Sequence, residues 1–281
     1  MDTKYDVAVA LRTYTGLGKN PPLFKEKIKL MEFCLKSFKN SLGSLHIKLW
    51  AILDRCPPEF KTIFRKYFPE EDLVFVELTE GGNQRTFAEQ IKILSEQTDS
   101  ELIYFAEDDY FYLPNQFEKM VHFMRNNPDA HFLSVYEHSD YYTQDIHAYP
   151  AELRISENLH WRTGVGTTWS FLTSKATFAK TRKTFETFVY TRNHDISIWM
   201  ALTKYNVCNP WRILKFLFRK YPDKNMNFMK MIGRSWQRSW KQILFGPTWK
   251  LWTPIPSIAT HMESNYLAIG IDWENEFKKG M

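Results

Sequence analysis

Short apolar runs alternate with amphipathic stretches over residues 6–109 of the chain. The apolar runs have the length of buried strands, and the amphipathic stretches repeat apolar residues every three or four positions, as helices do. The pattern predicts strands at 6–13, 46–53, 73–78 and 101–109, and helices at 24–42, 57–68 and 86–97. Because strands that alternate with helices form a parallel sheet covered on both faces, we predict an α/β fold.

The pattern is less regular after residue 110. Residues 138–163 are polar, rich in Tyr and irregular, and a connection of that length is typical of a functional loop. The other segments predict a helix from Asn115 to about Pro128, strands at 130–137 and 169–172, and helices at 176–190 and from Asp195 onward. These segments add further strands and helices to the predicted α/β fold.

Charge is unevenly distributed along the 281 residues, whose net charge is +5. Ten Lys and Arg residues and a single acid, Asp223, lie between Pro210 and Trp252, so this segment carries +9 and the rest of the chain −4. Within it, apolar residues follow helical spacing with basic residues between them: Phe228, Met229, Ile232, Arg234, Trp236, Arg238, Trp240, Lys241, Ile243 and Leu244. A basic, Trp-rich amphipathic helix is typical of contact with an anionic membrane, although a helix packed on the rest of the chain is the stronger alternative.

Cysteine usage and hydropathy bear on the location of the protein. Cys34, Cys56 and Cys208 are far apart and odd in number, which argues against a disulfide framework and against a zinc site. The sequence shows no secretory signal and no apolar stretch of about 18 residues that could span a membrane. We therefore expect a cytoplasmic protein, with peripheral contact to the cytoplasmic face of a membrane as an open alternative. No nucleic-acid motif occurs, so no nucleic-acid partner is expected.

Three consecutive carboxylates, Glu107, Asp108 and Asp109, end the strand predicted at 101–109. Side chains alternate across a strand, so Glu107 and Asp109 are expected on one side and Asp108 on the other. Two carboxylates on one side repel each other, and a cation usually offsets that repulsion. Oxygen ligands suit Mg²⁺ or Mn²⁺, with a substrate phosphate completing the shell. The alternative is a solvated acidic turn.

Other polar groups follow the carboxyl ends of the predicted strands, at residues 12–15, Asp54 and 81–85. Ligands of parallel α/β sheets bind at the carboxyl ends of the strands. We therefore expect these groups to share one rim of the sheet with Glu107, Asp108 and Asp109.

In order and spacing, these segments resemble the GT-A fold glycosyltransferases, closest in style to the bacterial family-2 type, over residues 5–205 and near residue 261. The resemblance implies a mostly parallel, Rossmann-type central sheet with helices on both faces. It also implies a catalytic domain at 1–209, with a donor half at about 1–110 and an acceptor half at about 111–209. A basic, aromatic C-terminal helical segment, 210–281, would pack on that domain.

The resemblance implies roles for residues on the donor side. Glu107-Asp108-Asp109 matches the acidic metal motif of the family, with Glu at its first position. Asp109 is expected to bind the ion directly, while Glu107 and Asp108 would hold the ion's waters or the donor's ribose and sugar hydroxyls. His261 is similar to a late metal- or phosphate-binding histidine. The other expected donor-binding residues are Arg12, Thr13, Tyr14, Thr15, Asp54, Asn83 and Arg85, with Asp54 at the nucleobase.

On the acceptor side, Asp195 is similar to the catalytic base of inverting members, which lies at the start of a late helix. Its alternative role is to cap that helix, and His194 is the alternative base. Gly164, Gly166 and Thr167 belong to a segment that is similar to the glycine-containing acceptor-side loop of the family.

The activity that these features predict is that of a metal-dependent, inverting hexosyl- or pentosyltransferase. With Mn²⁺ or Mg²⁺ it would move a sugar from a nucleoside-diphosphate sugar to a hydroxyl of a glycan or lipid-linked acceptor, as in polysaccharide biosynthesis. Two other classes stay open. One is a nucleotidyltransferase on a related α/β sheet, for which residues 12–19 are a poor Gly-rich signature. The other is a non-catalytic basic module that binds membranes or polyanions.

Overall fold

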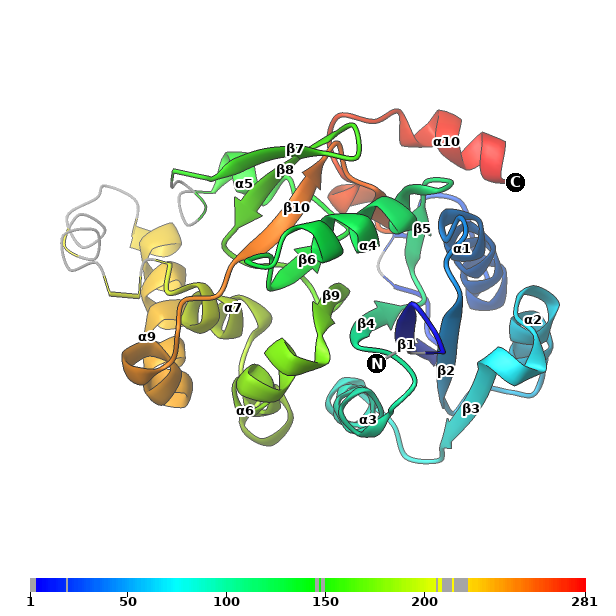
Figure 1. Ribbon diagram of the computed structural model, residues 1–281, viewed down its shortest axis with the longest axis horizontal. Helices are drawn as coiled ribbons and strands as arrows, with labels where there is room; N and C mark the ends of the chain where they lie inside the picture. Colours follow the sequence, from blue (N-terminus) through cyan, green and yellow to red (C-terminus); the bar gives the residue numbers. More distant parts are fainter. Residues whose placement is uncertain are drawn as a thin grey trace.

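A computed structural model describes residues 4–18, 20–144, 147, 150–205, 207–208, 214 and 222–281 of the chain. In these residues the chain forms a long sheet with helices on both faces (Figure 1). One face is covered by α1 (Lys27–Ser41), α2 (Glu59–Tyr67) and α4 (Gln116–Asn126). The other is covered by α3 (Asn83–Glu96), α6 (Lys175–Thr191) and α7 (Asp195–Thr203). The sheet therefore has a hydrophobic core on each side.

The strand β1 (Val7–Tyr14) lies at the centre of the parallel half of the sheet. It pairs in parallel with β2 (Ile47–Asp54) and with β4 (Leu102–Glu107), and β3 (Leu73–Leu78) pairs in parallel with β2. Val9 packs into one core and Ala10 into the other, which explains why the apolar run is continuous. The register sets Arg12 opposite Glu107 and Tyr14 opposite Asp54, so the polar strand ends meet at one edge.

The second half of the sheet mixes strand directions. The strand β9 (Phe171–Ser174) lies antiparallel between β4 and β6 (Phe132–Ser134), and β10 (Leu251–Ile255) pairs in parallel with β6. The antiparallel strands β8 (Leu159–Gly164) and β7 (Leu153–Ser156) complete the order β3-β2-β1-β4-β9-β6-β10-β8-β7. Only β8 and β9 run against the other strands of the described sheet. This confirms the predicted fold class, a mostly parallel α/β sheet of GT-A type.

Two predicted boundaries were wrong. Residues 138–163 are not an irregular loop, because they contain α5 (Asp140–Thr143) and the hairpin of β7 and β8. Leu159 and Trp161 of β8 are buried, whereas His160 between them is exposed, and Trp161 stacks on Phe123 at a centroid distance of 4.2 Å. The strand predicted at 101–109 ends at Glu107. After a two-residue turn, β5 (Tyr110–Tyr112) forms a separate two-stranded sheet with β11 (Ala259–His261).

The last part of the chain is interleaved with the rest. The strand β10 lies inside the long sheet, between β6 and β8, and β11 pairs with β5. The helix α10 (Trp273–Gly280) packs Phe277 against Phe33 of α1 and Phe111 of β5. Short 3₁₀ turns, Glu70–Asp72 and Ser264–Tyr266, and the helix α9 (Pro222–Phe245) complete the described elements. Part of the basic segment, including Arg212, Lys215, Arg219 and Lys220, lies outside the described residues.

None of the helices in the described ranges combines the length and the apolarity that a membrane span requires.

Candidate functional site

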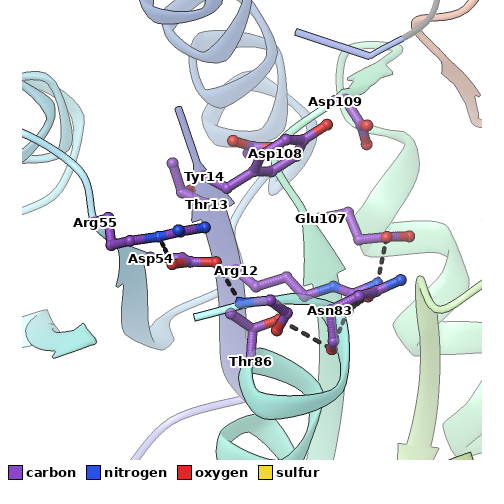
Figure 2. Close-up of a pocket in the computed structure, with 11 residues that line it drawn as sticks. Arg12, Thr13, Tyr14, Asp54, Arg55, Asn83, Thr86, Glu107, Asp108 and Asp109 are labelled. Carbon is purple, nitrogen blue, oxygen red and sulfur yellow. Dashed lines mark hydrogen bonds and ion pairs between the residues drawn. The ribbon is translucent and has the colours of Figure 1, made fainter. Parts of the chain in front are cut away.

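A pocket of about 370 Å³ opens at the carboxyl ends of β1, β2 and β4 (Figure 2). We call it the rim pocket. Its walls come from these strand ends and from the start of α3, as the sequence pattern predicts for a parallel sheet. The lining residues are Arg12, Thr13, Tyr14, Asp54, Arg55, Gly82, Asn83, Thr86, Glu107, Asp108 and Asp109.

Arg12 joins three elements at the floor of the rim pocket. Its Nη2 lies 2.5 Å from Glu107 Oε1, and its Nη1 donates to the side chain and to the backbone carbonyl of Asn83 (Figure 2). The other oxygen of Glu107 accepts a hydrogen bond from Ser170 Oγ at 3.2 Å. Both Glu107 oxygens therefore have protein partners, and its role as a metal ligand remains a prediction.

Asp108 forms a buried ion pair with Lys27, the first residue of α1. Asp108 Oδ1 lies 2.7 Å from Lys27 Nζ, and the two side chains are 2% and 4% exposed. The Lys27 ammonium also lies 4.6 Å from the ring centroid of Tyr14. Burial raises the pKa of Asp108 to about 6, and the charges of Asp109 and Glu107 add to the shift while Lys27 opposes it. The pair fixes both a carboxylate and an aromatic wall of the pocket.

The predicted alternation of the three acids across the strand was wrong. The ladder between β1 and β4 ends at Glu107, so Asp108 and Asp109 lie in the turn that leads to β5. A turn does not alternate its side chains as a strand does, and all three acids line the rim pocket.

His261 reaches Asp109 through the pairing of β11 with β5. Its Nε2 lies 3.2 Å from Asp109 Oδ2, and the neighbouring Met262 N–H donates to the Asp109 carbonyl at 2.7 Å. Burial lowers the pKa of His261, but the charge and hydrogen bond of Asp109, with Glu107 and Glu263, outweigh it and raise that pKa to about 9. The pKa of Asp109 is held at about 2, because His261 with nearby cations outweighs the effect of burial.

Two oxygens of the acidic turn fit a cation. Asp108 Oδ2 and Asp109 Oδ1 are buried and have no hydrogen-bond partner among the described residues. Carboxylate oxygens are the ligands that Mg²⁺ and Mn²⁺ prefer. The described side chains include no cluster of three or more His, Cys, Asp or Glu that could hold a metal by itself. These residues therefore fit an ion whose shell a phosphate and water complete.

Asp54 is buried against the glycine pair that precedes α3. Its Oδ2 accepts the Gly82 N–H at 2.7 Å, and its Oδ1 accepts Arg55 Nε at 2.9 Å. A Cβ on Gly81 would lie 1.5 Å from Asp54 Oδ1, and Gly82 has a φ of +113°, which few other residues adopt. The two glycines therefore let the carboxylate approach the backbone closely.

Of the other predicted donor-binding residues, some line the rim pocket and some do not. Thr13 is buried in the rim pocket, with an Oγ1 that has no partner in the described part of the chain, and Tyr14 forms a half-exposed wall. Thr15 is exposed and is not part of the lining. Arg85 is exposed, pairs with Glu80 at 3.0 Å and lies outside the lining, so the arginines of the pocket are Arg12 and Arg55.

A second pocket, of about 290 Å³, surrounds the start of α7. We call it the Asp195 pocket. It is lined by Tyr136, His138, Asp140, Tyr141, Gln144, His147, Gly166, Thr167, Thr168, Asp195, Ile196 and Met231. Asp195 is the first residue of α7, and its Oδ1 accepts the Ile196 N–H at 2.7 Å. Burial raises the pKa of the Asp195 carboxyl above its ordinary value.

The predicted cap role of Asp195 was wrong by one residue, because His194 occupies the N-cap position without a side-chain cap. His194 is exposed and outside the pocket lining. Gly166 and Thr167 line the Asp195 pocket as predicted, whereas Gly164 ends β8 and does not. A Cβ on Gly166 would lie 3.0 Å from Trp199 Cβ, so this loop packs closely on α7.

The two pockets are neighbours. Tyr110, the residue after the acidic turn, shares a hydrogen bond of 2.7 Å with Thr168 of the Asp195 pocket. The charge of Glu107 also contributes to the raised pKa of Asp195. The two pockets are therefore linked through Tyr110, which directly follows Asp109 of the rim pocket.

Residues 22–187, more than half of the chain, match the model of glycosyl transferase family 2. The chain belongs to glycosyl transferase family 2. No curated protein sequence matches it.

Solved structures similar to this family 2 chain include three proteins of low sequence identity. The mannosyltransferase PcManGT from Pyrobaculum calidifontis, in complex with GDP-Man and Mn²⁺, has 15% identity and a TM-score of 0.35, with 47% of this chain and 36% of that chain covered. S. aureus TarS has 13% identity and a TM-score of 0.45, with 83% and 44% covered. The 4-diphosphocytidyl-2C-methyl-D-erythritol synthase from Anaerococcus prevotii has 13% identity and a TM-score of 0.43, with 71% and 84% covered. This chain spans less than half the length of PcManGT and of TarS.

Sequence reasoning missed several residues of this family 2 site. Arg55 and Thr86 line the rim pocket, and Ser170 holds Glu107. Lys27 was missed because it lies at a helix start, far from any strand end. One signal was present: the positive end of the helix dipole disfavours a cation there, so a lysine at that position indicates a nearby acid.

Proposed function

We propose that this family 2 chain is a metal-dependent, inverting glycosyltransferase. It transfers a hexosyl or pentosyl group from a nucleoside-diphosphate sugar in the rim pocket to a hydroxyl of a glycan or lipid-linked acceptor in the Asp195 pocket. The observation that carries the proposal is the pairing of two adjacent pockets. One has two unpartnered carboxylate oxygens, and the other has a carboxylate whose pKa is raised by burial.

On the donor side, Asp108 Oδ2 and Asp109 Oδ1 are the atoms that would hold Mn²⁺ or Mg²⁺ together with the donor diphosphate. The ion supplies Lewis-acid neutralisation of the leaving diphosphate. Arg55, whose side chain is 65% exposed, would contact the phosphates, while Arg12 fixes Glu107 and Asn83. Thr13 and Tyr14 would contact the nucleoside, and Asp54 would accept from a base N–H.

On the acceptor side, Asp195 takes the proton of the attacking hydroxyl. Its Oδ1 is held by the Ile196 N–H, so Oδ2 is the oxygen that receives the proton. A general base works best when its pKa lies near the working pH, and burial shifts the Asp195 pKa in that direction. Attack by a hydroxyl that Asp195 deprotonates, on the sugar face opposite the diphosphate, gives inversion.

A ligand screen with two variants tests the proposal. Nucleoside diphosphates and their sugars are expected to raise the unfolding temperature of the wild type in the presence of Mn²⁺. Asp109→Ala is expected to lose this metal-dependent shift. Asp195→Asn is expected to keep it and to lose transfer by about 10² or more, with NMR of the product of the wild type showing inversion.

Other results would contradict the proposed metal site or identify a different reaction. Transfer and metal binding that survive Asp109→Ala unaltered would contradict the proposed metal site. Release of pyrophosphate from a nucleoside triphosphate and a sugar phosphate would identify a nucleotidyltransferase instead.

A further inference from the structure

The helix α9 packs one side onto the catalytic part of the chain. Phe228 and Ile232 are buried, and Ser235 Oγ donates to the Ser197 carbonyl of α7 at 2.9 Å. This is the packed helix that the sequence analysis left open as an alternative. The same helix contributes Met231 to the Asp195 pocket.

The C-terminal end of α9 leaves an apolar group in solvent. The helix is interrupted at Ser239, whose φ and ψ are −135° and 23°. Beyond it, Trp240, Leu244 and Phe245 are 45%, 54% and 78% exposed. The rings of Trp240 and Phe245 pack edge to face, with centroids 6.2 Å apart. We call these three residues the α9 tip. It lies at the periphery of the molecule, away from the sheet (Figure 1).

Positive charge runs along the helix to the α9 tip. Lys230, Arg234 and Arg238 are spaced four residues apart and so form one stripe of the helix, which we call the basic stripe. Lys230 and Arg234 are exposed, whereas Arg238 is half-buried and its Nε is out of contact with solvent. Lys241 lies next to the tip, with its Nζ 5.6 Å from the centroid of the Trp240 ring. The sequence has no acid between Phe228 and Lys250. None of the four cations forms an ion pair with a side chain in the described ranges, whereas Lys250 pairs with Asp129 and Glu152.

We propose that the α9 tip inserts among the headgroups of an anionic phospholipid surface, with the basic stripe over the lipid phosphates. Aromatic and aliphatic side chains with adjacent lysines or arginines are the groups that anchor peripheral helices in this way. A stable protein partner needs about 800 Å² of contact on each side, far more than three side chains provide. A lipid surface has no such requirement, because its attraction adds up over separate cations and apolar groups.

The contact would hold the Asp195 pocket near the lipid surface. Met231 and Phe245 are separated along α9 by at most about 20 Å at 1.5 Å per residue, since the helix is interrupted at Ser239. An acceptor whose sugar is carried on a membrane lipid would then meet Asp195 without leaving the surface. This consequence rests on the proposed function, whereas the lipid contact itself does not.

Co-sedimentation with vesicles tests the contact without any measurement of transfer. Wild type is expected to bind vesicles of phosphatidylcholine with phosphatidylglycerol, and to bind phosphatidylcholine alone at least tenfold more weakly. Trp240→Ser/Phe245→Ser is expected to weaken binding tenfold or more. Lys230→Gln/Arg234→Gln is expected to weaken it about fivefold per cation, with the difference disappearing at high salt.

The matched control is Leu153→Ser/Ile155→Ser. These two aliphatic side chains are 70% and 78% exposed on β7, which is a strand of the long sheet and not part of α9, so their removal is expected to leave vesicle binding unchanged. All variants change surface residues, and equal unfolding midpoints would show that the fold is retained.

Three results would overturn the proposal. They are no binding of the wild type to anionic vesicles, equal binding by Trp240→Ser/Phe245→Ser, and a similar loss in the Leu153→Ser/Ile155→Ser control. Lipid-free self-association that the tip variant abolishes, measured by sedimentation velocity, would assign the α9 tip to a second copy of the chain instead. Failure of the sugar-nucleotide screen with intact vesicle binding would reject the enzymatic proposal alone.

Discussion

Lys27 and Asp108 form an ion pair that water hardly reaches, and it is the most consequential residue-scale feature of the rim pocket. Removing two charges from water costs free energy. The buried pair is tolerated because each partner neutralises the charge of the other. If Lys27 is removed, the Asp108 charge is left buried beside Asp109 and Glu107. The pair therefore links stability to the shape of the pocket.

Lys27→Met is expected to lower the free energy of unfolding by about 3–5 kcal/mol at neutral pH. Lys27→Met/Asp108→Asn is expected to regain much of that loss, because no unpaired charge then remains. Urea unfolding of the single and double variants measures both values. Lys29→Met is the control, since the ion pair of Lys29 with Glu26 is exposed and its loss should cost under about 1 kcal/mol. An equal cost for Lys27→Met and Lys29→Met would contradict this account.

A buried histidine, His147, leads to a prediction about how the stability of the protein depends on pH. His147 is buried against the Tyr141 ring, and burial, with the charges of His138 and Arg162, lowers its pKa from 6.5 to about 4. Between pH 6.5 and pH 4, His147 binds a proton in the unfolded chain but not in the native protein. Protonation therefore favours the unfolded chain, and the free energy of unfolding decreases as pH falls from 6.5 toward 4. At pH 5 the expected loss is about 2 kcal/mol relative to neutral pH.

His147→Asn is expected to lose this part of the pH dependence. Urea unfolding at pH 5 and pH 7 gives the comparison, with the wild type expected to change more between the two than the variant. An identical change in both proteins would show that His147 is not responsible.

At the scale of elements, the turn between β3 and α3 depends on a glycine without space for a side chain. A Cβ on Gly81 would overlap the Asp54 carboxylate, which is held by the Gly82 N–H and by Arg55. The carboxylate would have to move, and the Gly82 N–H would lose its partner.

Gly81→Ala is therefore expected to destabilise the protein by about 1–3 kcal/mol and to weaken sugar-nucleotide binding in the rim pocket. Thermal unfolding with and without the nucleotide measures both effects. Gly18→Ala is the control, because a Cβ there meets nothing within 4 Å. The explanation fails if the two alanine variants behave alike.

The elements also show what sequence patterns can and cannot predict. The strands β1, β2 and β4 were predictable because they lie inside the sheet and are apolar in a continuous run. The strand β3 lies at the edge of the sheet and was predictable from its own short apolar run. The strands β5 and β11 are three residues long and pair with each other over a wide sequence separation, so neither has a local pattern. For the site, strand ends located Asp54, Asn83 and the acidic turn. Arg85 lies outside the lining of the rim pocket because residues two apart on a helix face different sides, and Asn83 is the one that faces the pocket.

At the scale of the whole molecule, the position of β10 argues against an independent domain that ends at residue 209. This strand has β6 on one side and β8 on the other, and its Trp252 is fully buried. Without it, β6 and β8 would have unpaired edges in the middle of the sheet. No local pattern in the sequence could show this, because β10 is far from both neighbours along the chain.

A chain of residues 1–209 is expected to lack cooperative unfolding, which circular dichroism during urea titration measures. A chain of residues 1–271 keeps β10 and β11 and loses only α10, so it is expected to unfold cooperatively at a lower urea concentration than the full chain. Cooperative unfolding of the shorter chain at the midpoint of the full chain would show that residues 1–209 are an independent domain.

Because β11 pairs with β5, the two partners of the Asp109–His261 contact are synthesised at different times. Asp109 and His261 are 152 residues apart in the chain, and a ribosome adds about 5–20 residues per second. The nascent chain therefore carries the acidic turn for roughly 8–30 s before its histidine has been synthesised. During that interval Asp109 lacks its histidine partner, so the rate of translation determines when a new molecule can first form the contact between Asp109 and His261.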